Sequence, residues 1–289
     1  MRNALIRSEQ FQFKRFQGRG RRITVRGDRV QFVNVRGEES SDPTELPLRS
    51  DSLALSTLQK LPPNEGGEEI KRFASLFTTF RVFNVDVERA RKPGRFALEP
   101  IASDASNLAA ALLSLQRDHE DVYMDLLDDA RAMIPGFVGI EFADVGGAEP
   151  AVAVKIVEAG LRDSTFLADA SFGTVRLLAL LALLYDPQPP PLTCIEEIDH
   201  GLHPYLFDRL VDRLREASQR TQLLIATHSP ALVNRLAPRE LIVVERAPDG
   251  STRLPAMSQR SIREKEAALE GRMQLGELWF SGSLGGVPR

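Results

Sequence analysis

A single cysteine, Cys194, is present among the 289 residues, and no run of 18 apolar residues occurs. One cysteine cannot form an internal disulfide framework or a multi-cysteine metal cluster. Without a long apolar run we expect no transmembrane helix, and the N-terminus lacks the apolar block of a signal peptide. We therefore expect a cytoplasmic protein that does not bind membranes.

An excess of charge of one sign is also lacking, because the formal net charge is −3. This balance gives no global case for binding to nucleic acid or to a membrane surface. The basic residues are nevertheless concentrated, since residues 1–36 contain ten lysines and arginines and only two acids. DNA is therefore one candidate partner of this segment, although a solvated hairpin face is the simpler interpretation. The basic residues concerned are Lys14, Arg15, Arg19, Arg21, Arg22, Arg26 and Arg29.

The first hundred residues predict a β-rich part with a loop insertion. Short runs of alternating apolar and polar residues between positions 4 and 36, separated by glycines, are typical of two or three antiparallel strands. Apolar spacing predicts helices over residues 53–61 and 68–80. β-favouring side chains predict a strand over residues 81–87.

Residues 101–170 predict a second part that combines helices and strands. Asp104 can cap a helix that runs to about residue 118, and a second helix is predicted over residues 121–133. Alternating apolar residues then predict a hairpin or meander with strands over residues 137–143 and 151–157.

The last part, residues 171–289, predicts an α/β arrangement. A buried helix over residues 175–185 precedes two short apolar runs, which are separated by an amphipathic segment that Pro204 opens. Two such strands with a helix between them predict a parallel sheet whose polar groups meet at one edge. Cys194 lies in the first run and is predicted to be a small core residue. A further buried strand is predicted over residues 241–245.

Polar groups follow both of these apolar runs. Glu196 and Glu197 come directly after the first run, and Thr227-His228-Ser229-Pro230 follows the second. Paired acids at the end of a buried strand suit phosphoryl transfer, in which one carboxylate holds Mg²⁺ and its neighbour orients the attacking water. In that case Glu196 would bind the metal, Glu197 would be the base, and His228 could contact the terminal phosphate.

A third polar segment, Ser171-Phe172-Gly173-Thr174, lies before the buried helix, where N–H groups favour an anion. Each feature also has a purely structural interpretation. The two acids can belong to a solvated loop, and Ser229-Pro230 can begin a helix as its cap and first residue. His200 and His203 serve the turn, because their spacing does not make a convincing metal pair. The occurrence of all three segments in this order favours the functional interpretation.

Together these segments resemble the second half of an AAA-type ATPase of the RecF/SMC/OLD kind, which is similar to the ATPase heads of ABC transporters. The resemblance covers residues 100–289. It implies a three-layer P-loop NTPase core with an antiparallel β-rich N-terminal part and a helical insertion. The cofactors that it implies are ATP and Mg²⁺, used by a nucleotide-gated dimer in DNA repair or phage defence. The tail Leu275–Phe280 also resembles tails of this family.

The same resemblance divides the chain into three parts and assigns site residues. Residues 1–100 would be the β-rich part of the ATPase lobe, residues 101–170 a signature subdomain, and residues 171–289 the C-terminal ATPase half. The implied roles are Ser171, Gly173 and Thr174 as signature residues that bind nucleotide, Asp199 in the D-loop region, Glu196 as Mg²⁺ ligand, Glu197 as catalytic base, and His228 as switch residue.

The sequence departs from the family pattern in four places. Phe172 stands where a small or acidic residue is usual, and Glu196 stands where aspartate is usual. Residues 198–200 read Ile-Asp-His where the family has Pro-Glu-Asn. Most importantly, no lysine is followed by Ser or Thr, so no Gly-x-x-x-x-Gly-Lys-Ser/Thr loop is present to bind phosphates.

We therefore expect the first strand and the phosphate-binding loop to be missing from this sequence, through a truncated gene product, a misplaced start, or a partner that supplies them. Such a loop makes several charge-assisted hydrogen bonds of about 1.5–3 kcal/mol each. Losing three or four lowers affinity by roughly 10³–10⁷, so the isolated chain should bind ATP weakly or not at all. Two alternatives stay open: a non-catalytic regulatory or partner-binding remnant of the fold, and a nucleic-acid-binding module formed by the basic strands.

Overall fold

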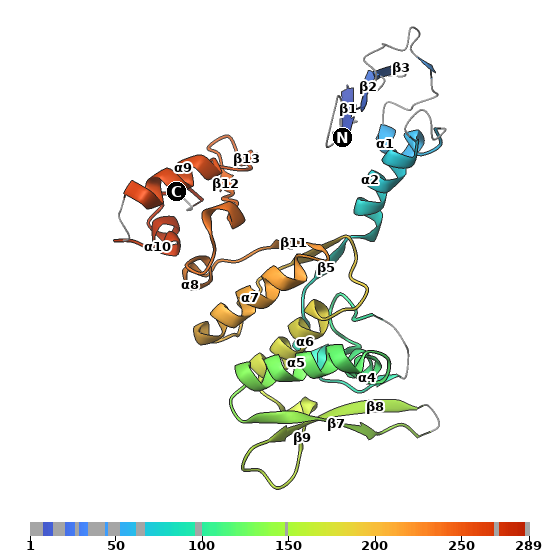
Figure 1. Cartoon of the computed structure of the whole chain (residues 1–289), viewed down its shortest axis with the longest axis vertical. Coiled ribbons are helices and arrows are strands. Elements are labelled where there is room, and N and C mark those ends of the chain that lie inside the picture. The colour runs from blue at the N-terminus through green and yellow to red at the C-terminus, as the bar shows by residue number, and fades with distance from the viewer. Residues whose placement is uncertain are drawn as a thin grey trace. The chain divides into compact units, whose positions relative to one another are not determined.

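The computed structural model describes residues 8–13, 21–26, 29–33, 44–45, 53–61, 67–95, 100–147, 150–268 and 272–286. The chain divides into two compact units, residues 1–80 and residues 81–289 (Figure 1). Of the basic N-terminal residues, Lys14, Arg15 and Arg19 lie outside the described residues. Among the described residues, no helix has the length and apolar character that crossing a bilayer requires.

The first unit contains an antiparallel sheet followed by two helices. Its strands are β1 (Ser8–Phe13), β2 (Arg21–Arg26), β3 (Arg29–Val33) and β4 (Thr44–Glu45), in that spatial order. The helices are α1 (Ala54–Leu58) and α2 (Gly67–Thr79). Ile23 and Val25 alternate along β2 onto one face and form a small core with Leu58 and Ile70 of the helices. The predicted antiparallel strands and helices are confirmed.

The second unit begins with β5 (Arg81–Phe83), which is shorter than predicted. The prediction of a strand over residues 81–87 is wrong for its second half. The Asp86 carboxylate accepts a hydrogen bond from the amide of Arg89, 3.1 Å away, and so caps helix α3 (Val87–Ala90). A capping carboxylate at this position starts a helix, although the neighbouring valines favour a strand.

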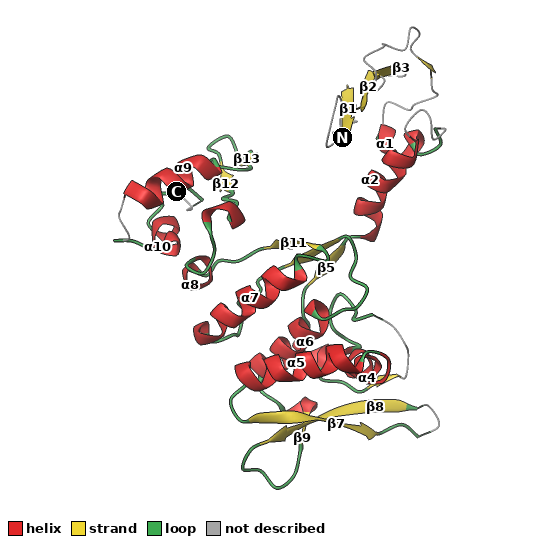
Figure 2. Cartoon of the chain, viewed as in Figure 1, coloured by secondary structure: helices red, strands yellow, loops and turns green. Residues whose placement is uncertain are grey.

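A helical layer lies on an antiparallel sheet at the bottom of the view in Figure 2. The helices are α4 (Leu108–Asp118) and α5 (Glu120–Met133), and both pack on the buried helix α6 (Phe172–Leu184). The sheet order is β6-β8-β7, and β9 pairs with β8. These strands are β6 (Gly94–Arg95), β7 (Phe137–Asp144), β8 (Ala151–Glu158) and β9 (Thr165–Phe166), followed by the 3₁₀ turn η2 (Leu167–Asp169).

A buried carboxylate ties these helices to the next one along the chain. The Asp129 side chain on α5 is 3% exposed and accepts hydrogen bonds from Tyr185, at the end of α6, and from Arg209 on α7 (Phe207–Ala217), both at 2.9 Å. Arg213 of α7 lies 2.6 Å from the same carboxylate. Because a buried carboxylate requires such partners, α5, α6 and α7 are held in one arrangement.

A three-stranded parallel sheet, ordered β11-β10-β5, carries the candidate site. Strand β10 (Leu192–Ile195) is central and β11 (Gln222–Ile225) is at one side. The 3₁₀ turn η3 (Pro204–Leu206) and helix α7 connect them. Ile195 pairs with Phe83 and Ile225, and these side chains pack into the core that α6 and α7 also build. The predicted α/β arrangement with a parallel sheet is confirmed.

The opposite face of this sheet carries apolar side chains that the described residues of the second unit leave exposed. Cys194 pairs in register with Val82 and Leu224, whose side chains are 41% and 54% exposed. Successive side chains of a strand point to opposite faces, so Cys194 lies on the side away from Ile195. It is only half-buried, and the prediction that it is a core residue is wrong.

The remaining chain forms short helices and a two-stranded antiparallel pair, with a small core of their own. The elements are α8 (Pro230–Val233), η4 (Pro238–Glu240), β12 (Glu245–Arg246), β13 (Thr252–Arg253), α9 (Gln259–Ala268) and α10 (Leu275–Phe280). The strand predicted over residues 241–245 is wrong except at its last residue. Val243 is buried in the local core, but Ile242 and Val244 are half exposed, and residues 241–244 pair with no strand among those described.

Candidate functional site

Two polar turns meet at one edge of the parallel sheet. The amide of Glu196 continues the pairing of β10 by donating to the carbonyl of Phe83, at 3.2 Å. The amide of Ala226 likewise donates to the carbonyl of Ile195, at 2.9 Å. The acid turn, defined here as residues 196–201, therefore starts beside the segment that leads to His228, as expected for parallel strands.

The acid turn holds Glu197 in an uncommon backbone conformation. Its φ angle is +47°, in the left-handed region that costs a non-glycine residue about 1–2 kcal/mol. The carbonyl of Glu197 accepts a hydrogen bond from the amide of His200, at 2.9 Å, which closes the turn. The His200 Nδ1 atom lies 3.4 Å from the Glu197 carboxylate. Strained backbone of this kind persists where the surroundings fix it, and such sites are often functional.

The exposure of Glu196 and Glu197 suits a metal ion that protein and ligand bind together, and not one that protein side chains enclose. Both side chains are exposed, and no cluster of three or more metal-ligating side chains occurs among the described residues. Magnesium is commonly held by one or two carboxylates together with substrate phosphates and water. Two adjacent exposed carboxylates could therefore take part in holding a Mg²⁺ ion that arrives with a nucleotide.

Asp199 connects the two turns. Its carboxylate accepts a hydrogen bond of 2.5 Å from the Thr227 hydroxyl, and the same hydroxyl accepts one from the amide of Ser229, at 3.0 Å. Ser229 caps α8 by accepting from the amide of Leu232, with Pro230 at the first helical position. The predicted helix start at Ser229-Pro230 is thus confirmed, and it coexists with a polar link to the acid turn.

His228 lies between Thr227 and Ser229, and its side chain is exposed. Within the described part of the chain, no hydrogen bond or ion pair joins its imidazole to Glu196 or Glu197. Strand β11 thus places the exposed His228 side chain at the same sheet edge as the acid turn.

The N-terminus of α6 lies against the acid turn. Ser171 caps the helix, because its hydroxyl accepts from the amide of Thr174, at 3.1 Å, and lies 2.9 Å from the Thr174 hydroxyl. A Cβ atom at Gly173 would stand 2.9 Å from the carbonyl oxygen of Gly201. Glycine is therefore required at 173 for the helix to approach the turn this closely.

Phe172 occupies the space between the same two segments. Its ring lies 5.4 Å from the His200 ring, centroid to centroid. A Cβ atom at Gly201 would stand 2.4 Å from the Phe172 ring, so the ring covers this glycine. The aromatic residue that departs from the family pattern is thus a packing element of the acid turn, although 40% of its surface remains exposed.

Arg176 is a site residue that the sequence reasoning did not identify. It is 2% exposed, and its Nη2 atom donates to the carbonyl of Glu197 at 2.6 Å and to that of Glu196 at 3.4 Å. Burial lowers the pKa of its guanidinium, while the charges of Glu197 and Asp199 act in the opposite direction. One signal was present in the sequence, because Arg176 is the only charged residue between Val175 and Tyr185.

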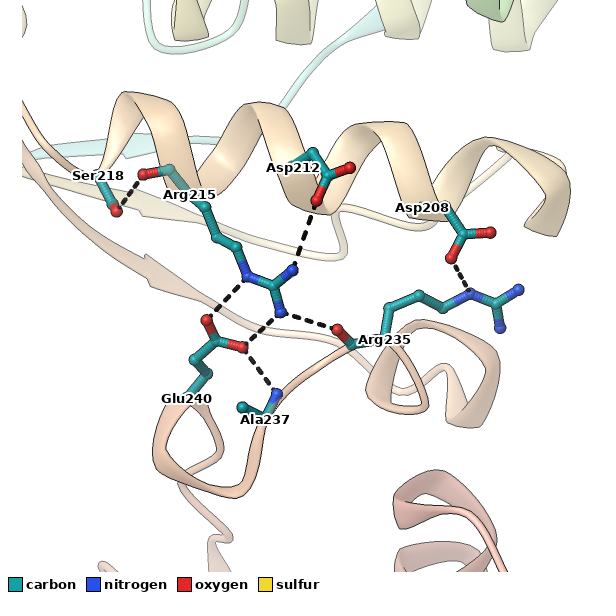
Figure 3. A network of polar contacts seen from close by, with 7 residues as sticks. All are labelled: Asp208, Asp212, Arg215, Ser218, Arg235, Ala237 and Glu240. Carbon is teal, nitrogen blue, oxygen red and sulfur yellow. Dashed lines mark hydrogen bonds and ion pairs between the residues drawn. The ribbon is translucent and has the colours of Figure 1, made fainter.

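A second polar network joins the helices that follow the two turns (Figure 3). Arg215 on α7 binds Glu240 of η4 through two nitrogens, at 2.9 and 2.8 Å, and donates to the carbonyl of Arg235. Arg235 in turn pairs with Asp208 of α7. The bidentate pair lowers the pKa of Glu240 to about 2. The segment after His228 is therefore anchored to α7.

Comparisons with known proteins identify the family. Residues 31–234 match a family model described as "AAA domain, putative AbiEii toxin, Type IV TA system". The chain belongs to this AAA family. The predicted AAA-type ATPase resemblance is thus confirmed, and the α/β core is that of a P-loop NTPase. No curated protein matches the chain.

Solved structures that resemble this family member include those of SMC proteins. One comes from work titled "Structural biochemistry of ATP-driven dimerization and DNA stimulated activation of SMC ATPases", with 18% identity and a TM-score of 0.39, covering 55% of this chain and 97% of that chain. A head bound to the C-winged helix domain of ScpA has 16% identity and a TM-score of 0.40, covering 84% and 69%. The head from Thermotoga maritima has 16% identity and a TM-score of 0.40, covering 87% and 74%.

Proposed function

We propose that this AAA-family chain provides the metal- and water-handling half of an ATP-hydrolysing site. The observation that carries this proposal is the convergence of three segments. The acid turn and the Thr227-His228 segment end at one edge of a parallel sheet, and the capped N-terminus of α6 packs on the acid turn. Family membership gives this geometry its chemical context.

Each residue has a role that its position supports. Glu196 would hold Mg²⁺, which neutralises phosphate charge when it is bound. Glu197 would accept a proton from the attacking water, because its carboxylate is exposed one residue further along the turn. His228 would contact the terminal phosphate from the neighbouring strand. The signature residues Ser171, Gly173 and Thr174 would face a nucleotide held by an opposing subunit.

The opposing subunit is part of this proposal. A signature segment serves a nucleotide bound across an interface, so we propose a nucleotide-gated homodimer or a complex with a partner that carries the phosphate-binding loop. Action on DNA, in repair or phage defence within the cytoplasm, is the cellular role that we propose for such a dimer. If the basic N-terminal residues contact DNA, the affinity should fall steeply with salt, and a flat salt response would exclude that surface.

Reconstitution tests the proposal. The chain would be purified from its native cells in a buffer that contains Mg·ATP. Any subunit that co-purifies and carries a Gly-Lys-Ser/Thr loop would be identified and expressed separately. Mixing the two purified proteins should produce ATP hydrolysis that Glu197→Gln lowers at least about a hundredfold, as expected for loss of a general base. Hydrolysis that is insensitive to Glu197→Gln would contradict the proposal.

The alternative function is a non-catalytic regulatory or partner-binding member of the fold. Phe172 favours it, because its ring stands where the family has a small or acidic residue, and it covers Gly201. Under this alternative the chain would bind its partner with equal affinity with and without Mg·ATP. Phe172→Ser would also leave the hydrolysis rate of the reconstituted complex unchanged.

A further inference from the structure

Arg176 is a buried cation whose guanidinium contacts the backbone of the candidate catalytic acids. It lies on the second turn of α6, where every following residue up to Tyr185 is apolar and buried. An arginine is rarely buried to this degree unless its charge and its donors have partners. The partners of Arg176 therefore indicate what it does.

Its hydrogen-bonding partners are backbone atoms of the acid turn. The Nη2 atom donates to the carbonyl oxygens of Glu197 and Glu196, at 2.6 and 3.4 Å. No carboxylate among the described residues lies within ion-pair distance of the guanidinium, and its Nε atom is buried without an acceptor. The side chain thus fixes the position of the turn, and the carboxylates of Glu196 and Glu197 remain available for chemistry.

The carbonyl that Arg176 holds most closely belongs to the strained residue. Glu197 has its φ angle at +47°, and its carbonyl also accepts from the amide of His200. A left-handed conformation at a non-glycine residue relaxes unless its surroundings hold it in place. Two donors on one carbonyl, one of them charged, provide that restraint.

Arg176 also shares a rigid element with the signature residues. Ser171 and Thr174 are joined on the first turn of α6, one turn before Arg176. Contacts between Gly173 and Gly201, and between Phe172 and His200, join the same helix turn to the far end of the acid turn. The acid turn is therefore held to α6 at both of its ends.

We propose that Arg176 is a positioning residue that holds the Glu197 backbone in its strained conformation and couples it to the signature turn of α6. Contact of a nucleotide with Ser171–Thr174 would then shift α6 and Glu197 together. This coupling rests on the proposed function, whereas the restraint of the turn by Arg176 does not.

Hydrogen exchange on the purified full chain tests the restraint without ATP. Arg176→Met keeps the length of the side chain and removes its donors, and Arg176→Lys keeps one donor. The matched control is Arg220→Met, because Arg220 also donates to two backbone carbonyls, those of Leu184 and Asp186, away from the acid turn. The reporters are the amides of His200 and Leu202, which close the turn.

Arg176→Met should speed exchange at these two amides at least about tenfold while the β7–β8 hairpin keeps its rates. Arg176→Lys should give intermediate rates, and Arg220→Met should leave the turn unchanged. Wild-type rates in Arg176→Met, or a uniform rise across the second unit, would overturn the proposal.

A second readout uses the reconstituted ATPase. Arg176→Met should lower kcat about tenfold or more with little change in KM, because the nucleotide contacts remain and the base is displaced. Insensitivity of the ATPase to Glu197→Gln would refute the proposed function and leave the exchange result standing. An ATPase that depends on Glu197 but is unaffected by Arg176→Met would refute the coupling alone.

Discussion

The Thr227 hydroxyl donates a short hydrogen bond to the Asp199 carboxylate, and this contact joins the turns that follow β10 and β11. Because Thr227 also accepts from the amide of Ser229, one hydroxyl connects the acid turn to the start of α8. His228 lies between Thr227 and Ser229, the two residues that the second of these hydrogen bonds joins. Its backbone is therefore placed relative to the acids by a polar link as well as by the sheet.

Replacing this hydroxyl tests the link. Thr227→Val keeps the shape of the side chain but leaves the Asp199 carboxylate and the Ser229 amide without their partner. We expect a loss of about 2 kcal/mol in the free energy of unfolding, measured with urea, since hydrogen bonds to charged groups contribute about 1.5–3 kcal/mol. The control Thr252→Val, at an exposed position of β13, should change stability by less than about 0.5 kcal/mol. Equal effects of the two substitutions would show that the link is unimportant.

The positive φ angle at Glu197 predicts that glycine is more stable than alanine at this position, the reverse of the usual order. At φ +47° alanine is strained and glycine is not, so Glu197→Gly should be more stable than Glu197→Ala by about 1 kcal/mol. At Glu196, which has no positive φ, the order should reverse, because glycine then only adds freedom to the unfolded chain. Thermal unfolding of the four variants measures both differences. The same order at both positions would contradict the turn geometry.

Local patterns predicted much of this architecture from the sequence. The strands before Glu196 and Thr227, the buried helix after Ser171 and the cap at Ser229-Pro230 all follow from apolar runs and capping residues. Their meeting at one sheet edge follows from the rule for parallel strands.

Non-local features could not be predicted in the same way. The sequence does not show which face of β10 packs on the helices, so it predicts Cys194 in the core, whereas Cys194 lies half-buried on the face away from Ile195. Residues 241–244 are a continuous run of β-favouring apolar residues, but strand formation also requires a pairing partner, and they pair with none of the described strands. Arg176 was missed because its partners are backbone carbonyls about 20 residues further along the chain.

The Arg215–Glu240 pair predicts a pH dependence of stability. Glu240 is ionised in the folded chain down to a pKa of about 2, against an ordinary value of 4.5, because Arg215 holds the charged form (Figure 3). A lowered pKa stabilises the fold above the unfolded value, and this stabilisation is lost as the pH falls from about 4.5 to about 2. Glu240→Gln should therefore cost about 2 kcal/mol at pH 6.

The difference between wild type and Glu240→Gln should shrink through that pH range and vanish near pH 2. Urea unfolding at several pH values measures it. Glu264→Gln provides the control, because Glu264 pairs with Arg260 on the exposed surface of α9 and such pairs contribute less than about 1 kcal/mol. A difference for Glu240→Gln that is constant with pH would contradict the role of Arg215.

Close packing of α10 on α8 predicts that a side chain larger than that of glycine at position 276 destabilises the chain. A Cβ atom there would stand 2.1 Å from the carbonyl oxygen of Pro230, and the amide of Gly276 donates to the Asn234 side chain. Gly276→Ala should therefore destabilise the chain by about 2 kcal/mol through overpacking. Gly139→Ala on β7, where no atom lies within 4 Å of the added carbon, should cost less than about 0.5 kcal/mol. Comparable melting temperatures for the two variants would show that α10 does not dock on α8 in this way.

In the proposed ATP site, this chain holds the acids and the switch histidine but does not hold the phosphates by itself. Equilibrium titration of the isolated chain with Mg·ATP, combined with steady-state hydrolysis, measures this directly. The sequence contains no Gly-Lys-Ser/Thr loop, so affinity should be weaker than that of a complete site by roughly 10³–10⁷. We predict no saturable binding at micromolar ATP and no hydrolysis that responds to Glu197→Gln. Micromolar affinity with steady turnover that Glu197→Gln abolishes would contradict the claim.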